Sequence, residues 1–300
     1  MKTNKLVLGT AQLGLNYGIV NKTGKPVESE AFAIMKFAVE NGISYLDTAY
    51  SYGDSEITIG KFLNSYKAYK NKLNITTKMP PLKRKKVNEE IINNYFLESL
   101  RRLGQESIYC YMIHDFNDIE NNCNVIGKTF LKLKEEGYIK KLGVSVYDEF
   151  QIRFLLKNFK FDLIQLPISI FDQRLIESDS LLEIKRKNIE IHARSVFLQG
   201  LIFLDENTVP IGLKKVKNYI ERLNVISLKF KFSKEEIALL FVNAISEIDK
   251  IVIGVEKIEQ LKKDVEILSK SESFDKIKTL INFKDFFIED TNIIEARRWI

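Results

Sequence analysis

Four polar residues in three separate segments have the side-chain types needed to transfer a proton to a carbonyl oxygen. Asp47 and Tyr52 lie in YLDTAYSYG, Lys78 lies in NITTKMP and His114 lies in CYMIHDF. A tyrosine has a pKa of about 10 in water and is therefore a poor acid. A nearby lysine would lower that pKa, an aspartate would hold the lysine charged, and a histidine would orient the carbonyl. The set predicts a proton relay, and the hydride must come from a cofactor.

Eight short β-rich runs position these residues, and helical periodicity fills most of the intervals between the runs. The runs are KLVLGT, ISYLDTA, NITTK, IYCYMIH, KLGVSV, FDLIQLP, NIEIHARS and KIVIGV. The usual spacing of roughly 30 residues is typical of βα units. Eight strand–helix repeats indicate an α/β fold of the (β/α)8 TIM-barrel type, with residues 1–300 forming a single domain.

Capping residues and apolar periodicity predict the helices between these strands. We expect helices over 28–41, 88–103, 125–136 and 148–158. The interval before strand eight is longer and predicts two helices, over 212–228 and 233–247, the second opened by a capping box. One of the two is therefore an extra helix inserted in the barrel.

The barrel explains where the polar residues fall, because active sites of such barrels lie at the carboxyl ends of the strands. Six polar side chains occupy such ends: Asp47, Lys78, His114, Ser145, Gln165 and Arg194.

The order and spacing of these motifs resemble the aldo-keto reductase family over nearly the whole chain. The matching pieces are DTAYSYGDSE (47–56), TTK (76–78), IHD (113–115), GVS (143–145) and ARSVFLQGL (193–201). The resemblance implies an NAD(P)H-dependent oxidoreductase that interconverts a carbonyl (aldehyde, ketone or sugar) and an alcohol. In that case Tyr52 is the general acid and base, Lys78 lowers its pKa, Asp47 orients Lys78, and His114 positions the carbonyl.

The resemblance also implies a set of cofactor contacts, although the chain has no G-x-G-x-x-G fingerprint. Ser145 and Gln165 would hold the nicotinamide carboxamide, and Arg194 stands where many relatives stack an aromatic ring. The full set is Thr10, Ser145, Gln165, Arg194, Ser195, Phe197, Gln199, Gly200, Gly254, Glu256, Lys257, Gln260 and Asp264.

The residues at the adenosine end indicate two different cofactors. Lys257 would bind the 2′-phosphate of NADP, whereas Glu256 would repel that phosphate and accept from the free ribose hydroxyl of NAD. The family favours NADP(H), so we expect NADP, with NAD as the alternative.

The expected substrate is a small-molecule carbonyl compound or sugar, contacted by Tyr17, Tyr50 and Trp299. Relatives fold a C-terminal tail over the barrel mouth, and Trp299 lies in that tail. The segment HDFNDIENN predicts a short loop after strand four and hence an open pocket for a polar or bulky substrate. Arg297 and Arg298 are a weaker indication of an acidic or phosphorylated substrate.

Composition argues against several other classes of protein. The net charge is +6, but basic and acidic residues are mixed, so a nucleic-acid surface is not expected. The basic run at 83–86 is interpreted as a solvated loop rather than a funnel for anions. No apolar stretch approaches the roughly 20 residues of a membrane span. Two cysteines, no metal-ligand spacing and no signal-peptide pattern suggest a metal-free protein of the cytoplasm.

Two other functions stay open at this point. The first is a regulatory or redox-sensing barrel that binds the cofactor but turns over little. The second is a lyase that uses Lys78 as a Schiff-base amine. The sequence does not determine the substrate, the direction of the reaction or the oligomeric state.

Overall fold

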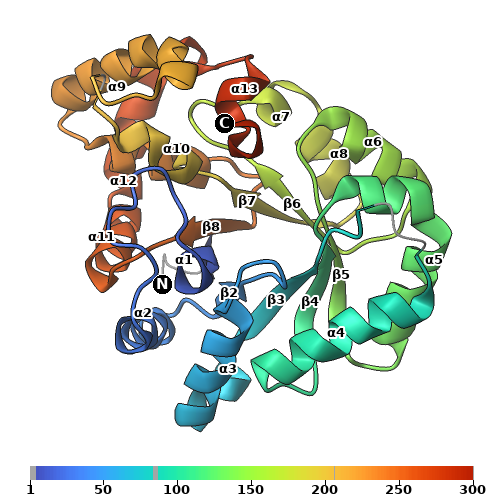
Figure 1. The fold of residues 1–300 in the computed structure, drawn as a ribbon. Helices are drawn as coiled ribbons and strands as arrows, with labels where there is room; N and C mark the ends of the chain where they lie inside the picture. The colour runs from blue at the N-terminus through green and yellow to red at the C-terminus, as the bar shows by residue number, and fades with distance from the viewer. Residues whose placement is uncertain (1–4, 84–86, 206, 300) are drawn as a thin grey trace.

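The computed structural model describes residues 5–83, 87–205 and 207–299, so residues 84–86 of the basic run lie outside the described residues. Within them, eight parallel strands pair in sequence order and β8 pairs with β1 (Figure 1). The strands are β1 Leu6–Gly9, β2 Tyr45–Asp47, β3 Asn74–Met79, β4 Ile108–Ile113, β5 Ile139–Ser145, β6 Leu163–Pro167, β7 Glu190–Arg194 and β8 Lys250–Gly254. The predicted (β/α)8 fold is confirmed.

Helices connect the strands and cover the outside of the barrel (Figure 1). They are α1 Ala11–Gly14, α2 Glu28–Glu40, α3 Ser55–Ser65, α4 Glu89–Leu103, α5 Phe116–Glu135, α6 Glu149–Asn158, α7 Arg174–Glu177, α8 Ser180–Arg186, α9 Lys217–Phe230, α10 Lys234–Asn243, α11 Ile258–Ser269, α12 Ser271–Ile277 and α13 Thr291–Ile294. Within the described residues, no helix has both the length and the apolar character needed to cross a bilayer.

The predicted caps account for where several helices begin and end. The Asn88 side chain accepts from the backbone N–H of Ile91, and Gly104 ends α4 in the left-handed conformation with φ of +61°. Ser233 and Glu236 form the predicted capping box at the start of α10. Each cap satisfies backbone groups that the helix itself leaves unpaired.

The segment expected to be a loop after strand four is mostly helical. The Asp115 side chain accepts from the backbone N–H of Asn117 at 3.0 Å, which starts α5 at Phe116 instead of near residue 125. The helix is irregular at Asn122, so a break in its periodicity hid its first turns. The connection after β4 is therefore shorter than HDFNDIENN.

The interval between β7 and β8 contains α9 and α10, preceded by the 3-10 segments η3 Leu198–Phe203 and η4 Ile211–Val216. The helix expected from 212 thus begins as a 3-10 turn, and the one expected to reach 247 ends at Asn243. After α12 the tail contains η5 Lys278–Leu280, η6 Phe283–Phe286, α13 and η7 Ala296–Arg298. Ile288 N–H donates to Phe171 O at 3.0 Å, which ties the tail to the segment after β6.

Strand register brings the chemically important positions to one edge of the barrel. Gly9 is paired with Asp47 on one side and with Gly254 on the other. Ser145 is paired with Gln165 across β5 and β6. These residues close their strands, so the side chains of Asp47, Ser145 and Gln165 gather at the carboxyl end of the barrel.

Candidate active site

Asp47 and Lys78 form a buried ion pair at the ends of β2 and β3. Lys78 Nζ donates to Asp47 Oδ1 at 2.5 Å and to the backbone oxygen of Thr48 at 2.9 Å. The Lys78 and Asp47 side chains are 1% and 4% exposed. Gln165 Nε2 donates to the other Asp47 oxygen at 2.7 Å. Both charges are therefore compensated by good hydrogen-bond geometry, as burial requires.

Tyr52 lies beside this pair, in the turn that joins β2 to α3. Lys78 Nζ is 4.9 Å from the centroid of the Tyr52 ring. The ring meets that of His114 edge to face, with the centroids 5.7 Å apart and the planes at 84°. The structure thus brings together the four residues of the predicted proton relay.

The phenol of Tyr52 stays protonated at neutral pH. Burial raises its pKa above the ordinary value, and the negative charge of Asp47 raises it further, while Arg194 lowers it. Burial and the charge of Asp47 thus outweigh any lowering of the Tyr52 pKa by Lys78, the effect that was expected from the sequence. The reason is that Asp47 lies directly on the ammonium group, so the pair presents little net positive charge to the phenol.

His114 is neutral over the physiological range. Burial lowers its pKa to about 3, and the positive charges of Lys78 and Arg194 act in the same direction. Its Nδ1 is buried and has no hydrogen-bond partner among the described residues. A neutral imidazole beside a protonated phenol can donate a hydrogen bond to an incoming carbonyl oxygen.

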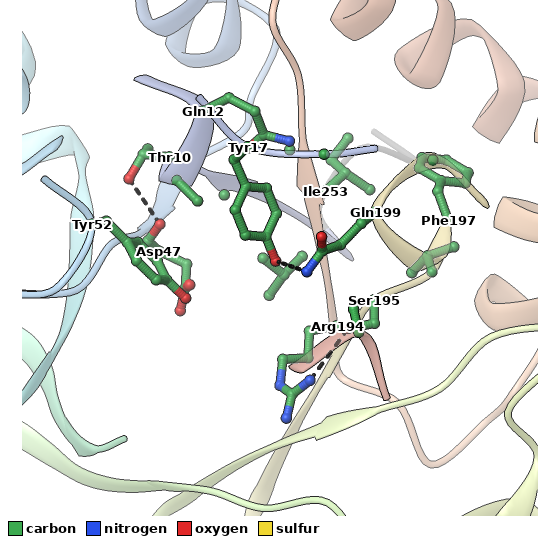
Figure 2. Close-up of a pocket in the computed structure, with 18 of the residues that line it drawn as sticks. Thr10, Gln12, Tyr17, Asp47, Tyr52, Arg194, Ser195, Phe197, Gln199 and Ile253 are labelled. Carbon is green, nitrogen blue, oxygen red and sulfur yellow. Dashed lines mark hydrogen bonds between the residues drawn. The ribbon is translucent and has the colours of Figure 1, made fainter. Parts of the chain in front are cut away.

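Asp47, Tyr52 and His114 line a cavity of about 390 Å³ that extends to Gln260 at the start of α11. Figure 2 shows part of its lining, including Asp47 and Tyr52. Of the residues predicted for the site, its lining includes Thr10, Tyr17, Asp47, Tyr52, His114, Ser145, Gln165, Arg194, Ser195, Phe197, Gln199, Gly200, Gly254, Glu256 and Gln260. Lys78 does not line the cavity itself, but it contacts Asp47, which does.

Two of the expected substrate residues do not line the cavity. Tyr50 points elsewhere, since its ring lies 4.0 Å from the guanidinium carbon of Arg102 and packs edge-on against Tyr95. Trp299 uses its indole N–H to donate to Ile293 O at 2.9 Å, which holds the ring against the tail itself. Tyr17 alone of the three expected substrate residues is at the cavity wall.

Of the residues expected to contact the adenosine part of the cofactor, some line the cavity and others do not. Glu256 lines the cavity, and burial raises the pKa of its carboxyl group. Lys257 is exposed to solvent and does not line the cavity. Asp264 is only 1% exposed and does not line the cavity either. Gln260 Oε1 accepts from the backbone N–H groups of Glu256 and Lys257 at 2.7 and 3.1 Å, so this side chain occupies the start of α11.

Two loops meet across the cavity between the end that holds Tyr52 and the end that holds Glu256. Gln199 Nε2 donates to the Tyr17 hydroxyl at 3.0 Å (Figure 2). Gln199 O accepts from Ile19 N–H at 3.0 Å. Gly200 adopts φ of +93°, and a Cβ there would lie 2.3 Å from a methyl group of Val20. Only glycine permits this approach of the loop after β7 to the loop after β1.

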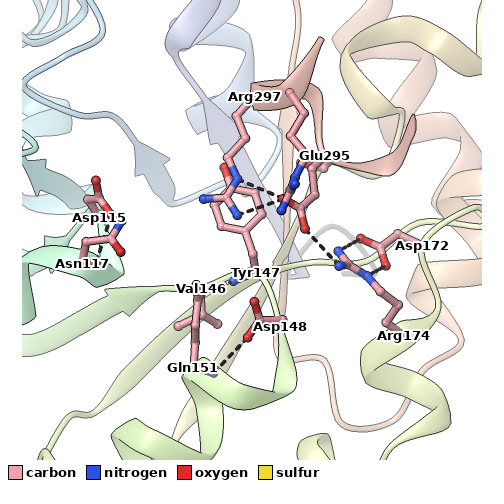
Figure 3. Close-up of polar contacts among 12 residues, drawn as sticks. Asp115, Asn117, Val146, Tyr147, Asp148, Gln151, Asp172, Arg174, Glu295 and Arg297 are labelled. Atoms are coloured by element: carbon pink, nitrogen blue, oxygen red, sulfur yellow. Dashed lines mark hydrogen bonds and ion pairs between the residues drawn. The ribbon is translucent and has the colours of Figure 1, made fainter. Parts of the chain in front are cut away.

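Three polar side chains of the cavity were missed or undervalued by sequence reasoning. The Gln12 side chain packs against Gly254, where a Cβ would lie 2.4 Å from its amide oxygen. Tyr147 follows Ser145, the last residue of β5, by two residues. This position just beyond a strand end could have marked it as a residue of the site. Arg297 reaches the cavity from the tail, and its guanidinium carbon lies 3.6 Å from the Tyr147 ring centroid (Figure 3).

A family model, curated relatives and solved structures were compared with this chain, and they agree on the family. The model of the family described as "Aldo/keto reductase family" matches residues 5–282. The chain is 26% identical over 265 residues to NADH-specific methylglyoxal reductase of Escherichia coli, covering 76% of this chain and 79% of that protein. It is 23% identical to L-galactose dehydrogenase of Arabidopsis thaliana over 297 residues, 91% of each chain. A holo aldo-keto reductase from Bacillus halodurans has the same fold, with a TM-score of 0.75, 24% identity and coverage of 95% and 94%.

Proposed function

The chain belongs to the aldo/keto reductase family and is an NAD(P)-dependent oxidoreductase, and we propose that it reduces a small-molecule carbonyl to an alcohol with Tyr52 as the proton donor. The observation that carries this proposal is the buried Lys78–Asp47 pair beside Tyr52 and His114. The Tyr52 O–H gives its proton to the carbonyl oxygen, and His114 holds that oxygen by a hydrogen bond. The phenol of Tyr52 is protonated at neutral pH, which is the form that reduction requires.

The lining residues fit a nicotinamide dinucleotide. Ser145 and the free amide oxygen of Gln165 would hold the carboxamide near Tyr52, and the loop from Ser195 to Gly200 would run along the phosphates. The bound cofactor supplies the hydride. The protein's own contribution is to orient the carbonyl and deliver the proton.

We propose NADH as the preferred cofactor, in place of the NADP(H) expected from the family. The carboxylate of Glu256 faces the cavity at its adenosine end, while Lys257 does not. A carboxylate there accepts from a ribose hydroxyl and repels a 2′-phosphate. The Escherichia coli relative is named as NADH-specific, which agrees with this choice.

The arrangement around Lys78 disfavours the lyase alternative. A Schiff-base amine must be neutral and must reach the substrate carbonyl. The Lys78 amine donates to Asp47 and to Thr48 O, and its side chain is 1% exposed. Borohydride trapping of a carbonyl compound on Lys78 would reopen that alternative.

The test is to titrate NADH and NADPH separately by fluorescence and then to follow oxidation of the preferred nucleotide with a panel of carbonyls. The panel includes methylglyoxal, butanal, glyceraldehyde and sugars. We expect tighter binding of NADH and turnover of at least one carbonyl. Tight binding without turnover of any carbonyl would favour the regulatory barrel, and failure to bind either nucleotide would contradict the proposal.

A further inference from the structure

We propose that the carbonyl substrate carries an oxyanion, a carboxylate or a phosphate, which Arg194 and Arg297 bind together beside Tyr147. The inference rests on the proposed function and deepens it, since it names the chemical class of the compound that is reduced. It comes from three side chains that the barrel and the tail bring together in one cavity.

Two guanidinium groups lie over the same tyrosine ring. The guanidinium carbon of Arg297 is 3.6 Å from the centroid of Tyr147, and that of Arg194 is 4.3 Å from it. The two positive groups are therefore at most about 8 Å apart, the limit set by adding these distances. A guanidinium stacked on a ring keeps N–H groups at its edge, where carboxylates and phosphates bind in bidentate fashion. All three residues line the cavity that contains Tyr52 and His114.

The charge of Arg194 is not taken up by a carboxylate. Its Nη1 donates to Ser195 Oγ at 3.2 Å (Figure 2). Its Nη2 donates to Val146 O at 3.1 Å, so both acceptors are neutral. No ion pair of Arg194 is found within residues 5–83, 87–205 and 207–299. Its positive charge reaches the reactive end, because it lowers the pKa values of both Tyr52 and His114. A ligand anion is the partner that this guanidinium lacks.

Arg297 does have a carboxylate partner, but that carboxylate is shared. Glu295 Oε2 accepts from Arg297 Nε and Nη2 at 3.0 and 2.9 Å and from Arg298 Nε at 2.8 Å. Its Oε1 accepts from Arg174, which also binds Asp172 (Figure 3). Glu295 is 2% exposed, so it fixes the direction of Arg297 without neutralising the three guanidinium groups around it. A guanidinium has five N–H donors, and Arg297 has donors left for a ligand.

The other acids at the cavity do not cancel this excess of positive charge. Asp47 is neutralised by Lys78, and Glu256 lies at the opposite, adenosine end. The competing ligand for Arg194 is the cofactor, because the family resemblance placed this residue where many relatives stack an aromatic ring on the nicotinamide. The position of Arg297 beside the same ring favours the substrate, because the tail and β7 then clamp one group from two sides.

The experiment compares two matched pairs of aldehydes at saturating NADH with the wild-type enzyme. Succinic semialdehyde is compared with butanal, and glyceraldehyde 3-phosphate with glyceraldehyde. We expect kcat/KM to be at least about tenfold higher for the anionic member of one pair, as for a charge pair formed in a partly buried site. The pair in which the anionic aldehyde is preferred shows whether the site takes a carboxylate or a phosphate. Equal values within both pairs overturn the inference but keep the proposed function. Turnover of none of the four, while another carbonyl of the panel is reduced, also overturns the inference alone. Turnover of no carbonyl at all overturns both.

Variants connect the preference to the two arginines. Arg297→Met should lower the ratio of anionic to neutral kcat/KM by about tenfold. Arg298→Met is the matched control, since Arg298 pairs with the same Glu295 but does not line the cavity, and it should keep the ratio. If Arg297→Met weakens NADH binding and leaves the ratio unchanged, the arginine serves the cofactor and the inference is wrong.

A wild-type measurement keeps the test independent of how the variants fold. Succinate and inorganic phosphate are added to the enzyme while it reduces butanal with saturating NADH. We expect at least one of them to inhibit competitively with butanal, because it occupies the arginine pair next to the carbonyl site. Absence of inhibition by both would contradict the inference.

Discussion

Lys78 and Asp47 are in direct contact, with 2.5 Å between Nζ and Oδ1, and both side chains are almost fully buried. The remaining hydrogen bonds of the pair go to Gln165 and to the backbone oxygen of Thr48. The ion pair is therefore fixed before a substrate arrives. Its near neutrality leaves Tyr52 protonated, which is the state that a proton donor requires.

Removing one member of this pair should destabilise the protein strongly. Asp47→Asn or Lys78→Met leaves an uncompensated buried charge, which costs about 3–5 kcal/mol in the free energy of unfolding. The double variant should lose less than the sum of the single losses, because it buries no lone charge. Urea unfolding of the four proteins measures this coupling, and strictly additive losses would show that the contact is unimportant for stability.

The raised pKa of Tyr52 predicts how the two reaction directions depend on pH. Reduction uses the protonated phenol, so its kcat should stay level from pH 6 to above pH 9. Alcohol oxidation uses the phenolate and should rise by about tenfold for each pH unit over that range. Steady-state rates in both directions test this, and a reduction rate that falls with a midpoint near pH 7 would mean that the pKa of Tyr52 is lowered instead.

His114 should make the fold less stable in acid. Its folded pKa of about 3 lies below the ordinary unfolded value of about 6.5, so between these values the unfolded state binds a proton that the native state does not. Its contribution is complete above the unfolded value and is lost, by about 1.4 kcal/mol per pH unit, as the pH falls toward 3. Denaturant unfolding at pH 7, 6 and 5 should therefore show a steeper loss for the wild type than for His114→Asn. Parallel pH profiles would contradict the assignment.

Glu256 should control the choice of nucleotide. Glu256→Gln removes the charge that faces the cavity, so the Kd for NADPH should fall by about tenfold relative to that for NADH, as expected for a partly exposed charge next to a phosphate. Lys257→Gln is the control, because Lys257 lies outside the lining, and it should change the ratio less. A larger effect of Lys257→Gln on NADPH binding would restore the NADP(H) expectation.

The parts that the sequence predicted well are those with a local physical signal. Alternation and capping residues mark strands and helices, and barrel geometry then places Asp47, Lys78 and His114 at neighbouring strand ends. The Ser233 capping box was visible for the same reason, since both partners lie within one turn.

The parts that were missed depend on long-range packing. Arg297 meets Tyr147 only because the tail folds back to the segment after β6, through Ile288 and Glu295. Tyr50 has the same residue type as Tyr52, yet it turns toward Arg102 instead of the cavity. Neither orientation follows from spacing along the chain. The start of α5 at Phe116 was hidden by the irregular residue Asn122 within the helix.

The most direct test of the account compares Tyr52→Phe with Tyr50→Phe, which removes the same hydroxyl group outside the cavity lining. Carbonyl reduction is measured at saturating NADH, and NADH binding is titrated for both variants. We predict that Tyr52→Phe loses about 10²–10⁴-fold in kcat, as when a general acid is removed, with its NADH Kd nearly unchanged, while Tyr50→Phe keeps its turnover. Near-full activity of Tyr52→Phe would contradict the assignment of the proton donor and with it the central claim.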